Sequence, residues 1–274
     1  MKTRIISAAV GIAVFFAAVF AAVKIDGIIL DILLMIVGAI GVYEALVPTG
    51  YLKSKFITVC AIIYAVVTPF AYSGYIPVNP EAFTVLFGLV VFASAMFMHR
   101  TVKPTEAAYA FAMTVVVTYC FWSMAAVFNY KDGHGLFYLL LVFVAAWTCD
   151  TGAYFSGYFF GKHKMAPEIS PKKTVEGAIG GVIFAAVCMF VSCIIFKAIT
   201  GQTANALLLV AVSPLLSVAG MIGDLIASYI KRDCGIKDYG KIMPGHGGIL
   251  DRFDSVMTVV PILYLIISHF NIVI

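Results

Sequence analysis

The sequence predicts an all-α, polytopic membrane protein with about nine transmembrane helices, its N-terminus cytoplasmic and its C-terminus outside. Of its 274 residues, 62% are hydrophobic and only 12% are charged, and the mean hydropathy is +1.03. A typical soluble domain is about 45–50% apolar and about 25% charged. The apolar residues also fall in runs of about 20, which is the length that a helix needs to cross a bilayer. These observations exclude a soluble globule, a disordered chain and a coiled coil.

Nine apolar runs are long enough to be spans: roughly residues 5–23, 27–47, 56–73, 82–98, 106–128, 136–159, 177–196, 205–229 and 253–270. The first run follows Lys2 and Arg4 and could be a signal peptide, but it is longer than the usual signal core of about 7–15 residues. We therefore expect an anchor that stays. The six cysteines include no CxxC pair, and most lie inside apolar runs, where cysteine behaves as a small hydrophobic residue.

The distribution of basic residues predicts the orientation. With nine spans, 15 of the 18 Lys and Arg residues fall on one side of the membrane. Because basic residues concentrate in cytoplasmic loops, that side is expected to be cytoplasmic. The same reasoning places the N-terminus inside and the C-terminus outside.

The ionisable residues divide the chain into two parts. Residues 1–135 carry almost no ionisable groups at depth and are expected to form an N-terminal transmembrane scaffold of about five spans. Residues 136–274 are expected to form a C-terminal catalytic transmembrane region of about four spans. Two long cytoplasmic loops, about 160–176 and 230–252, hold most of the Gly, Pro and charge of this region.

The sixth span and the loop after it carry the first polar motifs. Asp150 lies near the inner end of the span, where a carboxylate faces a cavity or a partner, or else satisfies a neighbouring helix. The loop then places hydroxyls, two adjacent lysines and a glutamate before the next span, namely Ser170, Lys172, Lys173, Thr174 and Glu176. A helix N-terminus with added cations suits phosphate. An ordinary basic patch on anionic lipid is the alternative.

The eighth span and the loop that follows carry the remaining candidates. Asp224, Ser228 and Lys231 are spaced i, i+4 and i+7, so one helix face carries all three. Glycines surround His246 in the loop, and Asp251 and Asp254 are neighbours on one face of the ninth span. Carboxylate oxygens combined with phosphate and water are the ligands that Mg²⁺ prefers. No GxxxxGK[ST] sequence is present, so the site is not a P-loop.

These motifs resemble a known family. The stretch from Ser228 to Asp254, with Lys231-Arg232, Lys237-Asp238, the sequence PGHGG at 244–248 and Asp251-Arg252-x-Asp254, resembles the signature of phosphatidate cytidylyltransferases, also called CDP-diacylglycerol synthases. The motifs at 150–152 and 170–177 resemble that family too. The specific resemblance covers about residues 147–254. A neighbouring lineage that uses isoprenoid or archaeal lipid acceptors stays open as an alternative.

The resemblance implies a nucleotidyltransferase of phospholipid biosynthesis that makes CDP-diacylglycerol and pyrophosphate from CTP and phosphatidate. Mg²⁺ would assist in-line attack of the lipid phosphate on the α-phosphorus of CTP. By this analogy Asp224, Asp251, Lys231 and Arg232 are catalytic, and the metal is held by Asp224 and Asp251 with Asp254 nearby. Phosphates would be bound by Ser170, Lys172, Lys173, Thr174, Ser228, His246 and Arg252. Further candidates are Asp150, Glu176, Lys237 and Asp238.

The same resemblance implies partners and a location. The partners would be CTP, phosphatidate, the lipid bilayer and, as one option, a second copy of the chain in a homodimer, with no nucleic acid. The enzyme would be a multi-pass protein of the plasma membrane, such as a bacterial inner membrane, with its active site on the cytoplasmic side. The main rival is an ion-coupled transporter with Asp150 and Asp224 as coupling groups, but alternating access favours a site at the midplane. The multi-Asp motif of CDP-alcohol phosphotransferases is absent.

Overall fold

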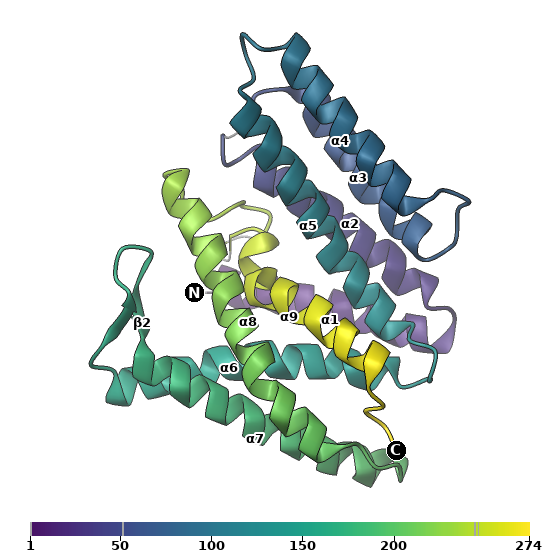
Figure 1. Ribbon diagram of the computed structural model, residues 1–274. Helices are drawn as coiled ribbons and strands as arrows, with labels where there is room; N and C mark the ends of the chain where they lie inside the picture. Colours follow the sequence, from purple (N-terminus) through teal and green to yellow (C-terminus); the bar gives the residue numbers. More distant parts are fainter. Residues whose placement is uncertain (1, 51, 244, 246) are drawn as a thin grey trace. The chain divides into compact units, whose positions relative to one another are not determined.

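The computed structural model describes residues 2–50, 52–243, 245 and 247–274, and for residues 2–9 and 12 it describes the backbone alone. The described residues form nine α-helices and one small β-hairpin (Figure 1). The helices are α1 Lys2–Lys24, α2 Ile28–Leu46, α3 Lys55–Tyr72, α4 Pro80–Phe97, α5 Pro104–Phe128, α6 Gly135–Phe160, α7 Val175–Thr200, α8 Ala206–Asp233 and α9 Leu250–His269. The strands are β1 Lys164–Ala166 and β2 Ser170–Thr174.

The predicted all-α membrane fold is confirmed. Each of the nine expected spans coincides with a helix to within a few residues. Among the described residues, the seven helices α2–α8 are long and apolar enough to cross a bilayer. Large apolar side chains on these helices are exposed, for example Leu89 and Ile183, as expected for surfaces that contact lipid. Helix α9, whose first turns carry the charged residues Asp251, Arg252 and Asp254, is not among these seven.

The chain consists of two compact units. The first unit contains residues 1–126 together with 233–252, and the second contains residues 127–232 together with 253–274. The loop before α9 therefore packs with the N-terminal helices, although it lies late in the sequence.

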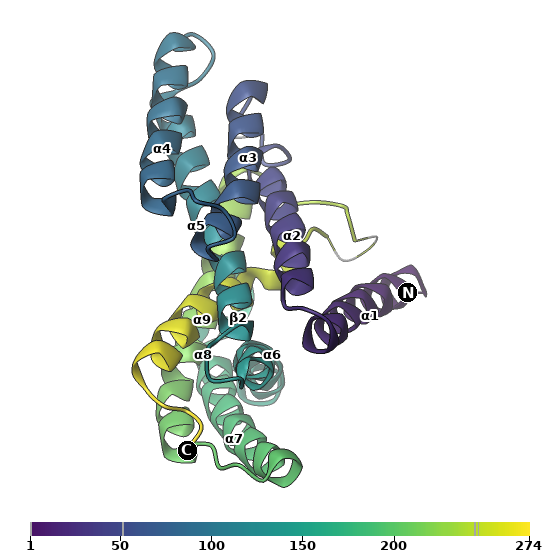
Figure 2. The ribbon, with the colours of Figure 1, turned by 90° about the vertical axis from the view of Figure 1, so that its right-hand side faces the viewer.

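In the first unit, α2–α5 lie side by side (Figure 2), and aromatic side chains pack between them. Tyr64 of α3 stacks on Phe87 of α4 with 4.5 Å between ring centroids, and Phe87 in turn stacks on Phe111 of α5. Gly38 of α2 lies against Phe121 of α5, where a Cβ atom would come within 3.2 Å of the Phe121 side chain. Aromatic contacts and close approaches at glycines such as Gly38 thus hold the four helices together.

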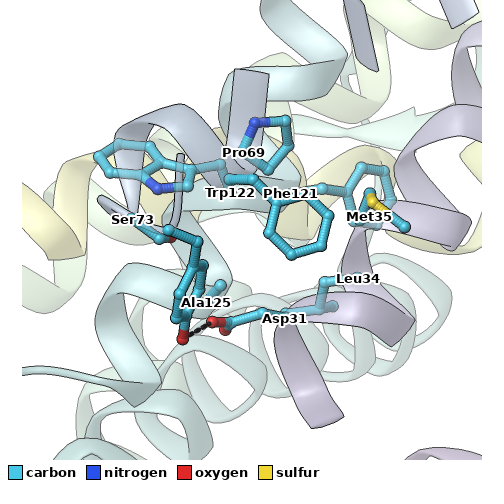
Figure 3. Close-up of a pocket in the computed structure, with 10 residues that line it drawn as sticks. Asp31, Leu34, Met35, Pro69, Ser73, Phe121, Trp122 and Ala125 are labelled. Carbon is cyan, nitrogen blue, oxygen red and sulfur yellow. Dashed lines mark hydrogen bonds between the residues drawn. The ribbon is translucent and has the colours of Figure 1, made fainter. Parts of the chain in front are cut away.

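Two carboxylates are buried in α2, which corrects the expectation that the first spans hold almost no ionisable groups. Asp31 is 7% exposed, and its Oδ2 accepts a hydrogen bond of 2.9 Å from the Tyr75 hydroxyl. Figure 3 shows Asp31 and Trp122 among the residues that line a small cavity of this unit. Glu44, at the other end of α2, is only 1% exposed. The N-terminal helices therefore hold specific polar contacts in addition to their apolar packing.

In the second unit, α6 and α7 lie side by side (Figure 1), and small residues line their contact. A Cβ atom at Gly177 would lie 2.7 Å from the Ala153 carbonyl oxygen, and one at Gly181 would lie 2.7 Å from the Cys149 carbonyl oxygen. Small residues spaced by four on both helices let their backbones approach closely, as in other membrane helix pairs. This crossing fixes the part of α6 that carries Asp150.

A hairpin that the sequence did not predict connects α6 to α7. Strands β1 and β2 pair antiparallel, with Lys164 opposite Thr174 and Ala166 opposite Ser170. The loop expected at residues 160–176 is therefore an ordered ribbon. The Thr174 hydroxyl then accepts a hydrogen bond of 3.1 Å from the Gly177 N–H and caps the N-terminus of α7.

We predict that Gly181→Leu will destabilise the protein strongly, because the new side chain would overlap the backbone of α6. Overpacking of this kind costs about 1–3 kcal/mol or more. A thermal melt of the purified protein in detergent should show a clearly lower Tm. Val187→Leu on the exposed face of the same helix is the matched control and should leave the Tm nearly unchanged. Equal melting of both variants would contradict the packing described here.

Candidate functional site

The second unit brings a lysine and an aspartate from distant elements into direct contact. Nζ of Lys173 lies 2.6 Å from Oδ2 of Asp224, and each side chain is about one quarter exposed, at 24% and 26%. Lys173 is positioned by β2, and Asp224 by α8. The Ser228 hydroxyl donates a 3.3 Å hydrogen bond to Oδ1 of the same aspartate, one helical turn away. The predicted face of α8 is therefore turned toward the hairpin lysine.

Two further carboxylates lie close to this ion pair. Oδ2 of Asp150 accepts a 2.9 Å hydrogen bond from the Ser255 hydroxyl. The Asp150 carboxylate also interacts electrostatically with Asp224 and Lys173. Asp254 interacts electrostatically with Asp224, Asp150 and Lys231. We call Asp150, Lys173, Asp224, Lys231 and Asp254 the carboxylate–lysine cluster.

Glycines of α8 explain why the cluster is so tight. A Cβ atom at Gly223 would lie 2.6 Å from the carbonyl oxygen of Asp254, and one at Gly220 would lie 3.3 Å from the Val259 side chain. The Thr258 hydroxyl also donates a 2.8 Å hydrogen bond to the Ala219 carbonyl. Because α8 and α9 touch at these small residues, Asp224 and Asp254 are held at the same level of the two helices.

The cluster carries three carboxylates and two ammonium groups. Carboxylates held close together and partly shielded from water repel one another, which favours the presence of additional cations. Among the described residues, no group of three or more His, Cys, Asp or Glu side chains forms a ready metal site. The oxygen donors are nonetheless of the kind that suits Mg²⁺, which commonly completes its shell with substrate phosphate and water.

In the first unit, Asp251 organises the glycine-rich loop before α9. Its Oδ2 accepts backbone hydrogen bonds from Tyr239 and Gly248, at 2.8 and 2.9 Å, and the residue is 8% exposed. Gly247 has a φ of +84°, which favours glycine, and a Cβ there would also lie 2.8 Å from Oδ2 of Asp251. Asp251 therefore shapes this loop from the first turn of α9.

Glu44 is a further buried residue at this loop, and the sequence pattern did not single it out. Its Oε2 accepts a 3.0 Å hydrogen bond from the Leu250 N–H, at the start of α9. Side chains at Gly240 and Gly248 would collide with the same carboxylate. The only signal in the sequence was a carboxylate near the end of a span that is otherwise apolar except for Asp31.

The other predicted residues take varied positions. Lys231 is buried, Ser170 is half-buried, and Thr174 caps α7. Glu176 contacts His163 at 2.6 Å and accepts the backbone N–H groups of Lys162 and His163, so it anchors the start of the hairpin. Five candidates are exposed, namely Lys172, Arg232, Lys237, Asp238 and Arg252. His246 lies outside the described residues. The predicted phosphate-binding roles of these residues stay predictions.

The chain is similar to proteins of a known family. The model of the cytidylyltransferase family matches residues 2–270. The chain is 44% identical over 155 residues to a protein named phosphatidate cytidylyltransferase from Staphylococcus haemolyticus (strain JCSC1435), covering 54% of this chain and 58% of that protein. It is 38% identical over 183 residues to the protein of the same name from Bacillus subtilis (strain 168), covering 67% and 66%. The aligned part thus spans less than two thirds of each of these relatives. With the family model matching nearly its whole length, the chain belongs to the cytidylyltransferase family.

Proposed function

We propose that this chain is an integral-membrane nucleotidyltransferase that makes CDP-diacylglycerol and pyrophosphate from CTP and phosphatidate. The carboxylate–lysine cluster carries the proposal, and within it the 2.6 Å contact between Lys173 and Asp224. The cluster joins cationic and carboxylate side chains that long apolar helices and the hairpin carry. A lipid phosphate and a soluble nucleotide can meet in such a place. The relatives named phosphatidate cytidylyltransferase support the same substrates.

The reaction requires charge compensation more than acid–base catalysis. An oxygen of the lipid phosphate forms a bond to the α-phosphorus of CTP, and the bond from that phosphorus to the bridging oxygen of the β-phosphate breaks. Pyrophosphate leaves with the electron pair of the broken bond. Because the attacking phosphate is already anionic near neutral pH, a strong general base is not needed. Lys173 and Lys231 would bind phosphate oxygens and orient the two substrates for in-line attack.

A divalent cation fits the donor set of the site. Asp224 and Asp254 of the cluster would hold Mg²⁺, with Asp251 from the first turn of α9 as the further ligand that the family resemblance implies. When bound, Mg²⁺ would neutralise charge on the triphosphate and on the departing pyrophosphate. Asp150, held by Ser255, would support the negative potential that attracts the ion.

The proposed reaction can be tested by following the label of CTP. Purified protein in detergent, given phosphatidate, Mg²⁺ and CTP labelled at the α-phosphorus, should produce a chloroform-soluble labelled lipid. CTP labelled at the γ-phosphorus should leave all label in the aqueous phase. Absence of α-label from the lipid would contradict the proposal and would favour the transporter alternative. The same assay with an isoprenoid phosphate in place of phosphatidate tests the alternative lineage with isoprenoid acceptors. A labelled lipid product from that acceptor alone would favour this lineage.

We also propose that the active site faces the cytoplasm, from the asymmetry of basic residues. Single cysteines at Lys53 and Lys172 in a cysteine-free background should react with a membrane-impermeant thiol reagent only from the cytoplasmic side, and one at Asn79 only from outside. All three side chains are exposed, so access within the protein is not limiting. A cysteine at Ser213, which is 0% exposed, should not react from either side. Labelling at Lys172 from outside would overturn this topology.

The metal proposal predicts non-additive mutants. Asp224→Asn and Asp251→Asn should each lower turnover by orders of magnitude, because the amide keeps the size of the side chain and loses its charge. The double mutant should be scarcely worse than either single mutant, since residues that act as a unit are not additive. Asp26→Asn, an exposed carboxylate outside the site, is the control. Well-folded Asp224→Asn and Asp251→Asn proteins with near-normal transfer would exclude the metal assignment.

A further inference from the structure

We propose that Glu44 is a positioning residue of the transferase site. Its carboxylate would hold the loop at residues 239–250 and the first turn of α9, and would thereby fix the place of Asp251. The catalytic part of this inference rests on the proposed function, whereas the structural part stands on the contacts within the first unit.

Glu44 caps a helix that lies about 200 residues later in the chain. The first N–H groups of an α-helix have no partner within the helix, and a negative charge near them is favourable. Oε2 of Glu44 accepts the Leu250 N–H at 3.0 Å, and the Ile249 N–H also interacts with this carboxylate. With only 1% of the residue exposed, these backbone groups take the place of water.

The glycines of the loop are matched to this carboxylate. A Cβ atom at Gly240 or at Gly248 would collide with the Glu44 carboxylate. Neither glycine has a positive φ, so backbone conformation does not require glycine at these two positions. Loop glycines often let the backbone approach a ligand closely. At Gly240 and Gly248 they make room for Glu44.

Glu44 and Asp251 accept different N–H groups of the same turn. Asp251 takes the Gly248 N–H at 2.9 Å, and Glu44 takes that of Leu250 two residues later. Asp251 also takes the Tyr239 N–H at 2.8 Å and so connects the two ends of the loop. If the Glu44 carboxylate is removed, the Leu250 N–H loses its acceptor. The turn is then held by Asp251 alone, and the Asp251 carboxylate shifts from its place.

The inference predicts a defect in catalysis beyond a loss of stability. Glu44→Ala should lower kcat by about tenfold to a hundredfold, the effect typical of residues that orient a metal ligand. It should also raise the Mg²⁺ concentration needed for half-maximal activity and leave the KM for phosphatidate nearly unchanged. Glu44→Gln should recover most of the kcat, because its amide oxygen can accept the Leu250 N–H.

Asp31→Ala is the matched control, because Asp31 is a buried carboxylate of the same helix that is held by Tyr75. It should lower the Tm without changing the Mg²⁺ requirement. If Glu44→Ala lowers the Tm as Asp31→Ala does and changes neither kcat nor the Mg²⁺ requirement, the positioning role is wrong.

A second variant keeps the test decisive if Glu44→Ala folds poorly. Gly248→Ala should reproduce the kcat and Mg²⁺ defects with the carboxylate still present. The same substitution in the Glu44→Ala background should add little, since the collision partner is gone. Independent, additive effects would overturn the inference.

Hydrogen–deuterium exchange separates this inference from the proposed reaction. Amides at residues 239–252 should exchange faster in Glu44→Ala than in Asp31→Ala, whether or not the protein transfers cytidylyl groups. If the wild type shows no transfer while exchange rises as expected, the proposed function fails and the structural part of the inference holds. Unchanged exchange at these amides would refute the role of Glu44 itself.

Discussion

Every charge that this protein buries among apolar helices has to find its partner within the protein. A carboxylate or an ammonium group loses several kcal/mol of hydration on entering an apolar environment, and only close partners compensate for that loss. The structure meets this constraint in two ways. In the second unit Asp224 is paired with Lys173 at 2.6 Å. In the first unit Glu44 and Asp251 accept backbone N–H groups of one loop.

The small residues of the chain follow from the same constraint. Short-range pairing of charges requires close backbones, and close backbones require glycine. Gly181 brings α7 onto α6, and Gly223 brings α8 onto α9, in each case at the level of a carboxylate. The loop glycines at 240 and 248 make room for Glu44 in the same manner. Packing and electrostatics are thus parts of a single arrangement.

Much of the fold was predictable because the bilayer imposes it. Runs of apolar residues gave nine helices in the expected places, and the i, i+4, i+7 spacing of Asp224, Ser228 and Lys231 correctly predicted a shared face. The hairpin at 164–174 was missed, because its strands are short and charged and have no apolar alternation. Glu44 was missed because its partner, Leu250, lies 206 positions away and offers only a backbone N–H. Periodicity detects side chains along one helix and does not detect such long-range contacts.

We propose that the carboxylate–lysine cluster binds a metal-bound nucleotide. The most direct measurement is the thermal stability of the purified protein in detergent, with and without CTP and Mg²⁺. A ligand that binds the folded state raises its melting temperature. We predict a rise with CTP and Mg²⁺ together, a much smaller rise with either alone, and no rise in Asp224→Asn. An unchanged melting temperature in the wild type, or an equal rise in Asp224→Asn, would contradict this account of the site.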